Sequence, residues 1–214
     1  MSLQFDFPAN LTAEKFIAQL SDKISLEAVS RQYSLKTYYD SFDWRLYKNG
    51  VTCEFNRSKT ASTLVLRNLG NDLIIASAEI KDVPTFSQEF QSEDIRSTLE
   101  PLLAMRALLP VCNLDYEIYH LNVVNKDEKT VLRLTLEEYD LFNNRVSLQP
   151  IKGYDKAAGH LIETLTTKLR LMPANKPLLL TALKMLGRKP NDYSSKMNIN
   201  LDPDMRADIA AKYI

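Results

Sequence analysis

The chain is short of long apolar runs, of glycine and of net charge. No apolar run approaches the roughly 20 residues that a membrane-spanning helix needs, so no membrane span is expected. Only five glycines occur in 214 residues, which argues against glycine-rich loops that cradle nucleotide phosphates. Lysine plus arginine and aspartate plus glutamate number 27 each, so no net field attracts a polyanion such as nucleic acid. Any anion site must therefore be a local concentration of charge.

Cysteine and histidine are also scarce, with two of each. Cys53 and Cys112 lie far apart inside apolar, strand-like runs, which favours two buried thiols over a disulfide or a metal pair. His120 and His160 share no metal-ligand spacing with Cys, Asp or Glu. The first residues do not form a charged-then-apolar signal pattern. These absences lead us to expect a cytoplasmic protein without a membrane partner.

What is present is an alternation of strand patterns and amphipathic helix patterns. Strand patterns occupy residues 3–7, 38–39, 51–55, 63–67, 73–80, 116–124, 130–136 and 146–149. Helix patterns occupy residues 12–20, 92–103, 154–171 and 175–186, and a further one begins at 202. About eight strands with helices inserted between them predict an α+β domain around a closed or nearly closed antiparallel barrel.

The densest group of turn and strand signals lies in residues 36–67. A Tyr-Tyr pair suited to a strand is followed by an Asp-Ser turn dipeptide, and an Asn-Gly turn precedes the next strand pattern. Trp44 lies among tyrosines in this stretch. Such a cluster is more often a packed corner than a base-stacking surface, and basic residues are not interleaved densely here. We therefore do not expect nucleic acid as a partner.

This stretch resembles the CYTH domains, also called triphosphate tunnel enzymes. Residues 38–46 are similar to the family's Tyr-Tyr-Asp-Thr-x-Asp-x-x-Leu motif, and residues 50–52 to its Gly-x-Thr. Residues 149–156 are similar to a Pro-Leu-Arg-Gly-Tyr-Glu-Lys run of one subgroup, in which the CYTH-like part precedes a CHAD domain, a helical domain that binds polyphosphate. The resemblance implies a CYTH-like tunnel domain over residues 1–190. Residues 191–214 then look like a linker and the start of a CHAD-type domain.

The resemblance also implies an eight-stranded tunnel that holds triphosphate or polyphosphate. In the family, carboxylates on one wall hold magnesium or manganese, and inward arginines and lysines clamp the phosphates. Carried over to this chain, Arg67, Arg133 and Lys152 are candidate phosphate-binding residues, and Glu79 and Glu137 are candidate metal ligands. The plainer interpretation of all five is that they are ordinary solvated charges on strands and turns.

Several motif positions depart from the family pattern. The first strand lacks the family's glutamates and carries Gln4 where the family has a lysine, and Glu54 and Asn56 replace an Arg-x-Arg pair. Ser147 and Gln149 replace paired glutamates on the last strand. Losing these carboxylates should abolish metal binding, and each lost charge-assisted phosphate contact removes roughly 1.5–3 kcal/mol.

Three hypotheses follow from this pattern. The first is a catalytically degenerate CYTH-like domain with an accessory structural or weak polyphosphate-recognition role in a CHAD-type protein. The second is a magnesium- or manganese-dependent triphosphatase that hydrolyses tripolyphosphate or nucleoside triphosphates through rearranged acids. The third is a protein-interaction module.

Overall fold

The computed structural model describes residues 3–174 and 176–193. The strands are β1 (Leu3–Asp6), β2 (Leu26–Asp40), β3 (Val51–Ser58), β4 (Ser62–Asn68), β5 (Ile74–Glu79), β6 (Leu109–Val124), β7 (Thr130–Tyr139), β8 (Arg145–Pro150) and β9 (Met172–Pro173). The helices are α1 (Ala13–Ser21), α2 (Arg45–Lys48), α3 (Glu93–Leu103), α4 (Asp155–Glu163) and α5 (Leu178–Met185), with a 3₁₀ turn at Ser87–Glu89 and a π-helical turn at Thr164–Lys168. The expected helix from 202 and most of the expected 191–214 segment lie outside the described residues.

All nine strands form one antiparallel sheet in the order β5-β4-β3-β2-β6-β7-β8-β1-β9. The predicted α+β class with an antiparallel, tunnel-type sheet is confirmed. The sheet has nine strands rather than eight, however, and its edge strands β5 and β9 do not pair with each other, so the expected barrel closure is corrected to a curved, open sheet. One reason is local: β9 is two residues long and ends in Pro173, which has no N–H to extend a ladder.

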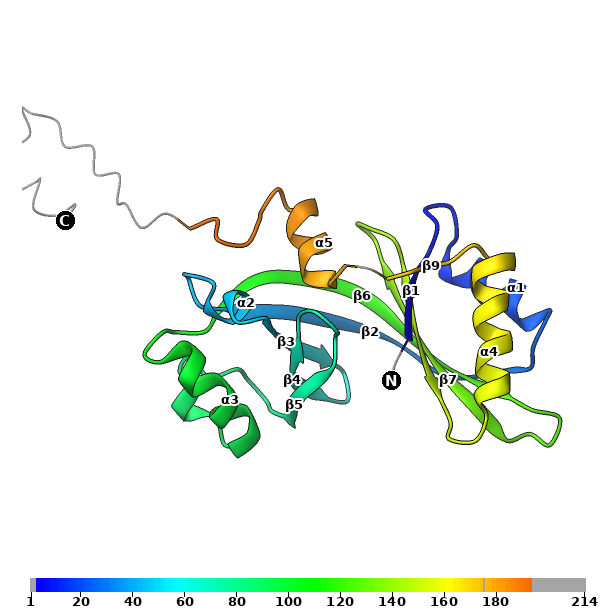
Figure 1. Cartoon of the computed structure of the whole chain (residues 1–214), viewed down its shortest axis with the longest axis horizontal. Helices are drawn as coiled ribbons and strands as arrows, with labels where there is room; N and C mark the ends of the chain where they lie inside the picture. The colour runs from blue at the N-terminus through cyan, green and yellow to red at the C-terminus, as the bar shows by residue number, and fades with distance from the viewer. Residues whose placement is uncertain (1–2, 175, 194–214) are drawn as a thin grey trace, which may run out of the picture.

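Two long strands, β2 and β6, run through both halves of the sheet (Figure 1). β2 pairs with β6 from Leu26 to Asp40, whereas β3 pairs only with Ser34–Tyr39. The sequence did not indicate a strand in residues 26–35. That stretch is mostly exposed, and its apolar residues do not follow the regular alternation that marks a half-buried strand.

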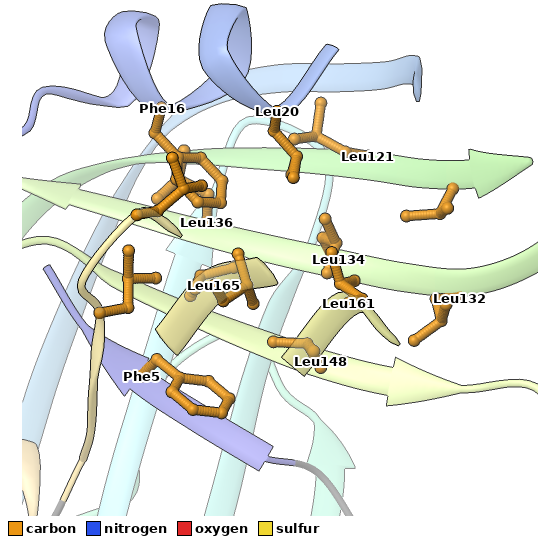
Figure 2. Close-up of a cluster of buried hydrophobic side chains, with 14 of the residues drawn as sticks. Phe5, Phe16, Leu20, Leu121, Leu132, Leu134, Leu136, Leu148, Leu161 and Leu165 are labelled. Atoms are coloured by element: carbon orange, nitrogen blue, oxygen red, sulfur yellow. The ribbon is translucent and has the colours of Figure 1, made fainter. Parts of the chain in front are cut away.

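Helices cover the outer face of the curved sheet. The largest core packs α1 and α4 onto β1, β6, β7 and β8, and Figure 2 shows Phe16 and Leu20 of α1 directed toward the strand leucines. α3 packs Ile95, Leu99 and Leu103 onto β3, β4 and β5 to form a second core. The helix expected at 154–171 ends its α-helical part at Glu163 and continues as the π-helical turn.

α5 is the exception, because it packs on the opposite, inner face. Its apolar side chains join a cluster with inward residues of β2, β6 and β7: Tyr38, Leu114, Tyr116, Tyr139, Leu178, Leu179, Ala182 and Leu183. Trp44 is 1% exposed in the same cluster, and its ring meets Tyr47 edge-on at 6.3 Å between centroids. The aromatic stretch is therefore a packed corner, as predicted.

Two further expectations can be compared with the described residues. Cys53 and Cys112 are both buried and free, as predicted. None of the helices in the described part of the chain combines the length and apolarity needed to cross a membrane.

Candidate functional site

Cross-strand register identifies the residues of the inner face. Lys36 is opposite Asn56, Asn56 is opposite Thr63, and Thr63 is opposite Glu79. Directly opposed residues project to the same side of a sheet. This register therefore places Glu79 on the inner face.

The same reasoning extends across the other half of the sheet. Glu137 of β7 is opposite Arg145 of β8, and Arg145 is opposite Asp6 of β1. Gln4 is opposite Ser147 on the same side. The inner face is therefore predominantly polar and carries both acids and bases.

Lys36 and Glu137 form a buried ion pair at the centre of this face. Lys36 Nζ lies 2.9 Å from Glu137 Oε1, and their side chains are 7% and 17% exposed. The Tyr139 hydroxyl donates to Glu137 Oε2 at 2.7 Å. Burial alone would raise the pKa of Glu137, but the Lys36 charge and the Tyr139 hydroxyl outweigh it and hold that pKa below its ordinary value. Glu137 is thus a stable carboxylate with both oxygens engaged.

Arg67 of β4 forms the second group. Its Nε lies 3.3 Å from Glu54 Oε2 on β3, and its guanidinium donates to the main-chain carbonyl of Asp72 at 3.1 Å. Burial raises the pKa of Glu54 above its ordinary value, and the nearby charges of Lys36 and Arg67 offset this only in part. The two inner carboxylates therefore differ, because Glu137 favours its charged form and Glu54 disfavours it.

Arg145 of β8 forms the third group. Its Nε donates to Asp6 Oδ1 at 2.8 Å, a second guanidinium nitrogen donates to Gln4 Oε1 at 3.3 Å, and the third donates to the carbonyl of Lys176 at 3.2 Å. Its side chain is 7% exposed. Gln4 in turn donates from Nε2 to Asp72 Oδ2 at 2.6 Å. Side chains thus form a continuous polar chain from Asp6 on β1 to Glu54 on β3.

The five residues singled out from the sequence fall into two groups. Arg67 and Glu137 are on the inner face and engaged in ion pairs. Arg133, opposite Gln149 of β8, and Glu79 of the edge strand β5 lie on the same inner face but are exposed, and Lys152 is exposed in the turn after β8. Among the described residues no hydrogen bond or ion pair joins any two of these five.

The residues present do not fit a metal held by several protein ligands. Within residues 3–174 and 176–193, no group of three or more His, Cys, Asp and Glu side chains is close enough to hold a metal ion. A hard divalent cation such as magnesium needs oxygen ligands. The oxygens of Glu137 are taken by Lys36 and Tyr139, so that carboxylate is not free to be one.

Two of the inner cations, Lys36 and Arg145, were missed by sequence reasoning. A signal for both was present in the period-two alternation of a strand. Arg145 lies two residues before Ser147 and so shares the face of a residue already assigned to the tunnel wall, and Lys36 lies two residues before Tyr38 of the Tyr-Tyr-Asp motif. Their carboxylate partners carried no such signal, because Lys36 and Glu137 are 101 residues apart.

The first aspartate of the Tyr-Tyr-Asp motif has a structural role here. Asp40 Oδ1 accepts hydrogen bonds from the backbone N–H groups of Ser41 and Leu46, and Oδ2 accepts one from Tyr47. Asp40 therefore holds the turn that carries Trp44, a residue with a left-handed backbone at φ 59°. These bonds lower the pKa of Asp40 against the burial that raises it, and burial prevails.

A curved antiparallel sheet with a charged inner face and most of its helices on the outer face defines a CYTH-like tunnel fold. The chain shares this fold with a proposed adenylyl cyclase from Hippeastrum described as having a dominant triphosphatase activity, at 11% identity over 90% of this chain and 99% of that one, with a TM-score of 0.58. A proposed adenylate cyclase from Bacillus halodurans also has this fold, at 14% identity over 84% of this chain and 96% of that one, with a TM-score of 0.58. Another from Vibrio parahaemolyticus matches at 12% identity over 87% of this chain and 97% of that one, with a TM-score of 0.54. No family model matches the sequence, and neither does any curated protein. At these identities the likeness establishes the fold.

Proposed function

We propose that this chain is a tunnel-fold domain that does not hydrolyse triphosphate and serves an accessory, structural role. One observation supports this most directly: each of the inner cations Lys36, Arg67 and Arg145 is bound to a carboxylate from another strand. A cation already neutralised by a buried carboxylate has to break that pair before it can bind a phosphate. These three paired cations therefore hold strands together and are not free to clamp a ligand.

The same proposal includes weak polyphosphate recognition beside a CHAD-type helical domain that follows residue 190, in a cytoplasmic setting. Arg133 and Lys152 are the residues that would supply it. Both are exposed, and neither forms an ion pair within the described part of the chain. Two exposed cations give weak, salt-sensitive binding, because each is screened at physiological ionic strength.

The test is release of phosphate from tripolyphosphate over hours with excess magnesium or manganese. We expect release no faster than from heat-killed protein. Calorimetric titration of tripolyphosphate into the same sample measures binding separately from turnover. Release that is lost on Glu79→Gln or Glu137→Gln, in protein that stays folded, would show that these acids are catalytic.

A second candidate is a metal-dependent triphosphatase. It is favoured by the presence of acids and bases on one inner face, Glu54 and Glu137 with Lys36 and Arg145, and by the activity described for the Hippeastrum neighbour. For this function the ion pairs would have to exchange partners when substrate and metal bind. Metal titration at a fixed triphosphate concentration separates the two candidates, because only the second expects phosphate release to rise with metal.

A further inference from the structure

The first half of β2 has an unpaired edge. Residues 26–33 pair with β6 on one side, while β3 reaches only Ser34–Tyr39 on the other. Among the described residues, no hydrogen bond is made to the free backbone edge of residues 26–33. Val29 lies at a bulge in the pairing with β6 and is 57% exposed. An unpaired strand edge presents N–H and C=O groups to which another extended segment can pair.

An apolar pocket opens beside this edge, under helix α1. Its volume is about 490 Å³. Most of its wall is aliphatic or aromatic: Ile17 and Ala18 of α1, Ala28 and Val29 of β2, and Tyr119 and Leu121 of β6. We call it the α1 pocket. Ala18 lies on the exposed side of α1, so the pocket is reached without opening the core.

A second, acidic pocket continues along the same strand and shares Arg31 with the first. Its volume is about 220 Å³. Its wall holds four carboxylates against the single guanidinium of Arg31: Asp115, Glu117, Glu138 and Asp140. Arg31 is already committed to Glu117, 2.7 Å away. These carboxylates lie on β6 (Asp115, Glu117) and at the end of β7 (Glu138, Asp140), so the outer face beside this end of the edge is locally negative, although the chain as a whole is neutral.

We propose that the free edge of β2 binds an extended peptide segment of a partner protein. The segment adds a strand beside residues 26–33, places an apolar side chain in the α1 pocket and a lysine or arginine in the acidic pocket. Side chains on one face of a strand recur every second residue, about 6.6 Å apart. The two pockets follow each other along β2, so the apolar and basic residues are two or four positions apart in the segment.

Charge complementarity selects this occupant over the other candidates. A second copy pairing through its own residues 26–33 would bring one arginine, Arg31, together with Glu27, so it adds no net positive charge. Nucleic acid and phosphate ligands are repelled by four carboxylates. A basic, strand-forming peptide satisfies the free backbone, the apolar pocket and the acidic pocket together. The site lies on the outer face and does not depend on whether the inner face is catalytic.

The probe is an array of eight-residue peptides with threonine at alternate positions. On the other face, each peptide carries one apolar residue (Val, Leu, Ile or Phe) and one basic residue (Lys or Arg), with either of the two first in the sequence. Each peptide is matched by a scrambled peptide whose apolar and basic residues lie on opposite faces. Binding is read by fluorescence anisotropy, and the site by amide shifts in ¹⁵N-labelled protein. Two variants change the pockets at exposed positions: Ala18→Trp fills the α1 pocket and Asp140→Lys reverses a charge of the acidic pocket. Gln19→Trp on α1 and Asp127→Lys in the β6–β7 turn are the matched controls.

We expect patterned peptides to bind and scrambled ones not to bind, with shifts concentrated in residues 26–33. Ala18→Trp and Asp140→Lys should each weaken binding about tenfold, and the controls should change it less than about twofold. The proposal is overturned if no patterned peptide exceeds its scrambled match, or if the pocket variants bind as the controls do. Shifts confined to β5 or the inner face, or concentration-dependent self-association lost in the pocket variants, would overturn it as well.

Discussion

The side-chain amide of Gln4 donates a 2.6 Å hydrogen bond to Asp72 Oδ2 and so joins the first strand to the turn between β4 and β5. No backbone ladder closes the sheet here, because β5 and β9 do not pair. Asp72 also accepts from Arg67, and Gln4 also accepts from Arg145. A series of side-chain hydrogen bonds thus closes the tunnel where backbone pairing does not.

We predict that Gln4→Ala loosens this closure more than it lowers global stability. A hydrogen bond makes a net contribution of about 0.5–1.5 kcal/mol to stability. The free energy of unfolding measured in urea should therefore fall by roughly 1 kcal/mol. Amides of β1 and β5 should exchange with solvent faster, because each strand loses the link to the other. Gln149→Ala is the matched control, since Gln149 lies on the same face and its side chain forms no hydrogen bond with a described residue. Equal rates of amide exchange in β1 and β5 of the two variants would mean that the Gln4 hydrogen bond does not hold these strands together.

The two inner carboxylates should respond oppositely to neutralisation. Glu137 has a lowered pKa, so its charged form stabilises the fold above its ordinary pKa of about 4.3, and this stabilisation is lost as pH falls through the lowered folded-state pKa. Glu137→Gln leaves Lys36 without its carboxylate and should cost about 3–5 kcal/mol at pH 7. The difference from wild type should shrink as the pH falls toward the lowered value.

Glu54→Gln is the matched comparison, because Glu54 has a raised pKa. Its folded state prefers the protonated form, so stability attributable to Glu54 falls as pH rises through the raised pKa. The amide keeps a hydrogen-bond acceptor for Arg67, which also contacts Asp72, so Glu54→Gln should cost less than Glu137→Gln at pH 7. Urea unfolding curves at several pH values measure both variants. A larger loss for Glu54→Gln than for Glu137→Gln would contradict the assignment of the central ion pair.

Sequence patterns predicted the fold class, most strand positions and the inner side of several strands. Gln4, Glu54, Asn56 and Ser147 were assigned to the tunnel wall by motif and period, and register places all of them on one face. The first half of β2 was missed because its strand is imposed by pairing with β6, not by its own apolar pattern. The ion pairs were missed because their partners are distant in sequence, so only the folded sheet brings them together.

Helix α5 should contribute to stability through the inner face. Leu183 is fully buried against the cluster that contains Tyr38 and Trp44. Leu183→Ala should cost about 2–5 kcal/mol, because it removes apolar burial and leaves a cavity. Leu186→Ala is the control, since Leu186 is 47% exposed. Trp44 is the only tryptophan, so its fluorescence during urea unfolding reports this cluster directly.

Substitution of arginines separates structural from binding roles on this sheet. Arg67 is 25% exposed in its side chain and bridges Glu54 and Asp72, so Arg67→Met should lower the unfolding midpoint and leave tripolyphosphate binding unchanged. Arg133 is exposed and forms no ion pair with a described residue, so Arg133→Ala should leave the midpoint unchanged and weaken whatever tripolyphosphate binding exists. Thermal unfolding and calorimetric titration on the same samples measure both effects. If Arg67→Met abolishes binding in protein that remains folded, Arg67 exchanges its carboxylate partners for phosphate. The accessory, structural role would then give way to ligand binding within the tunnel.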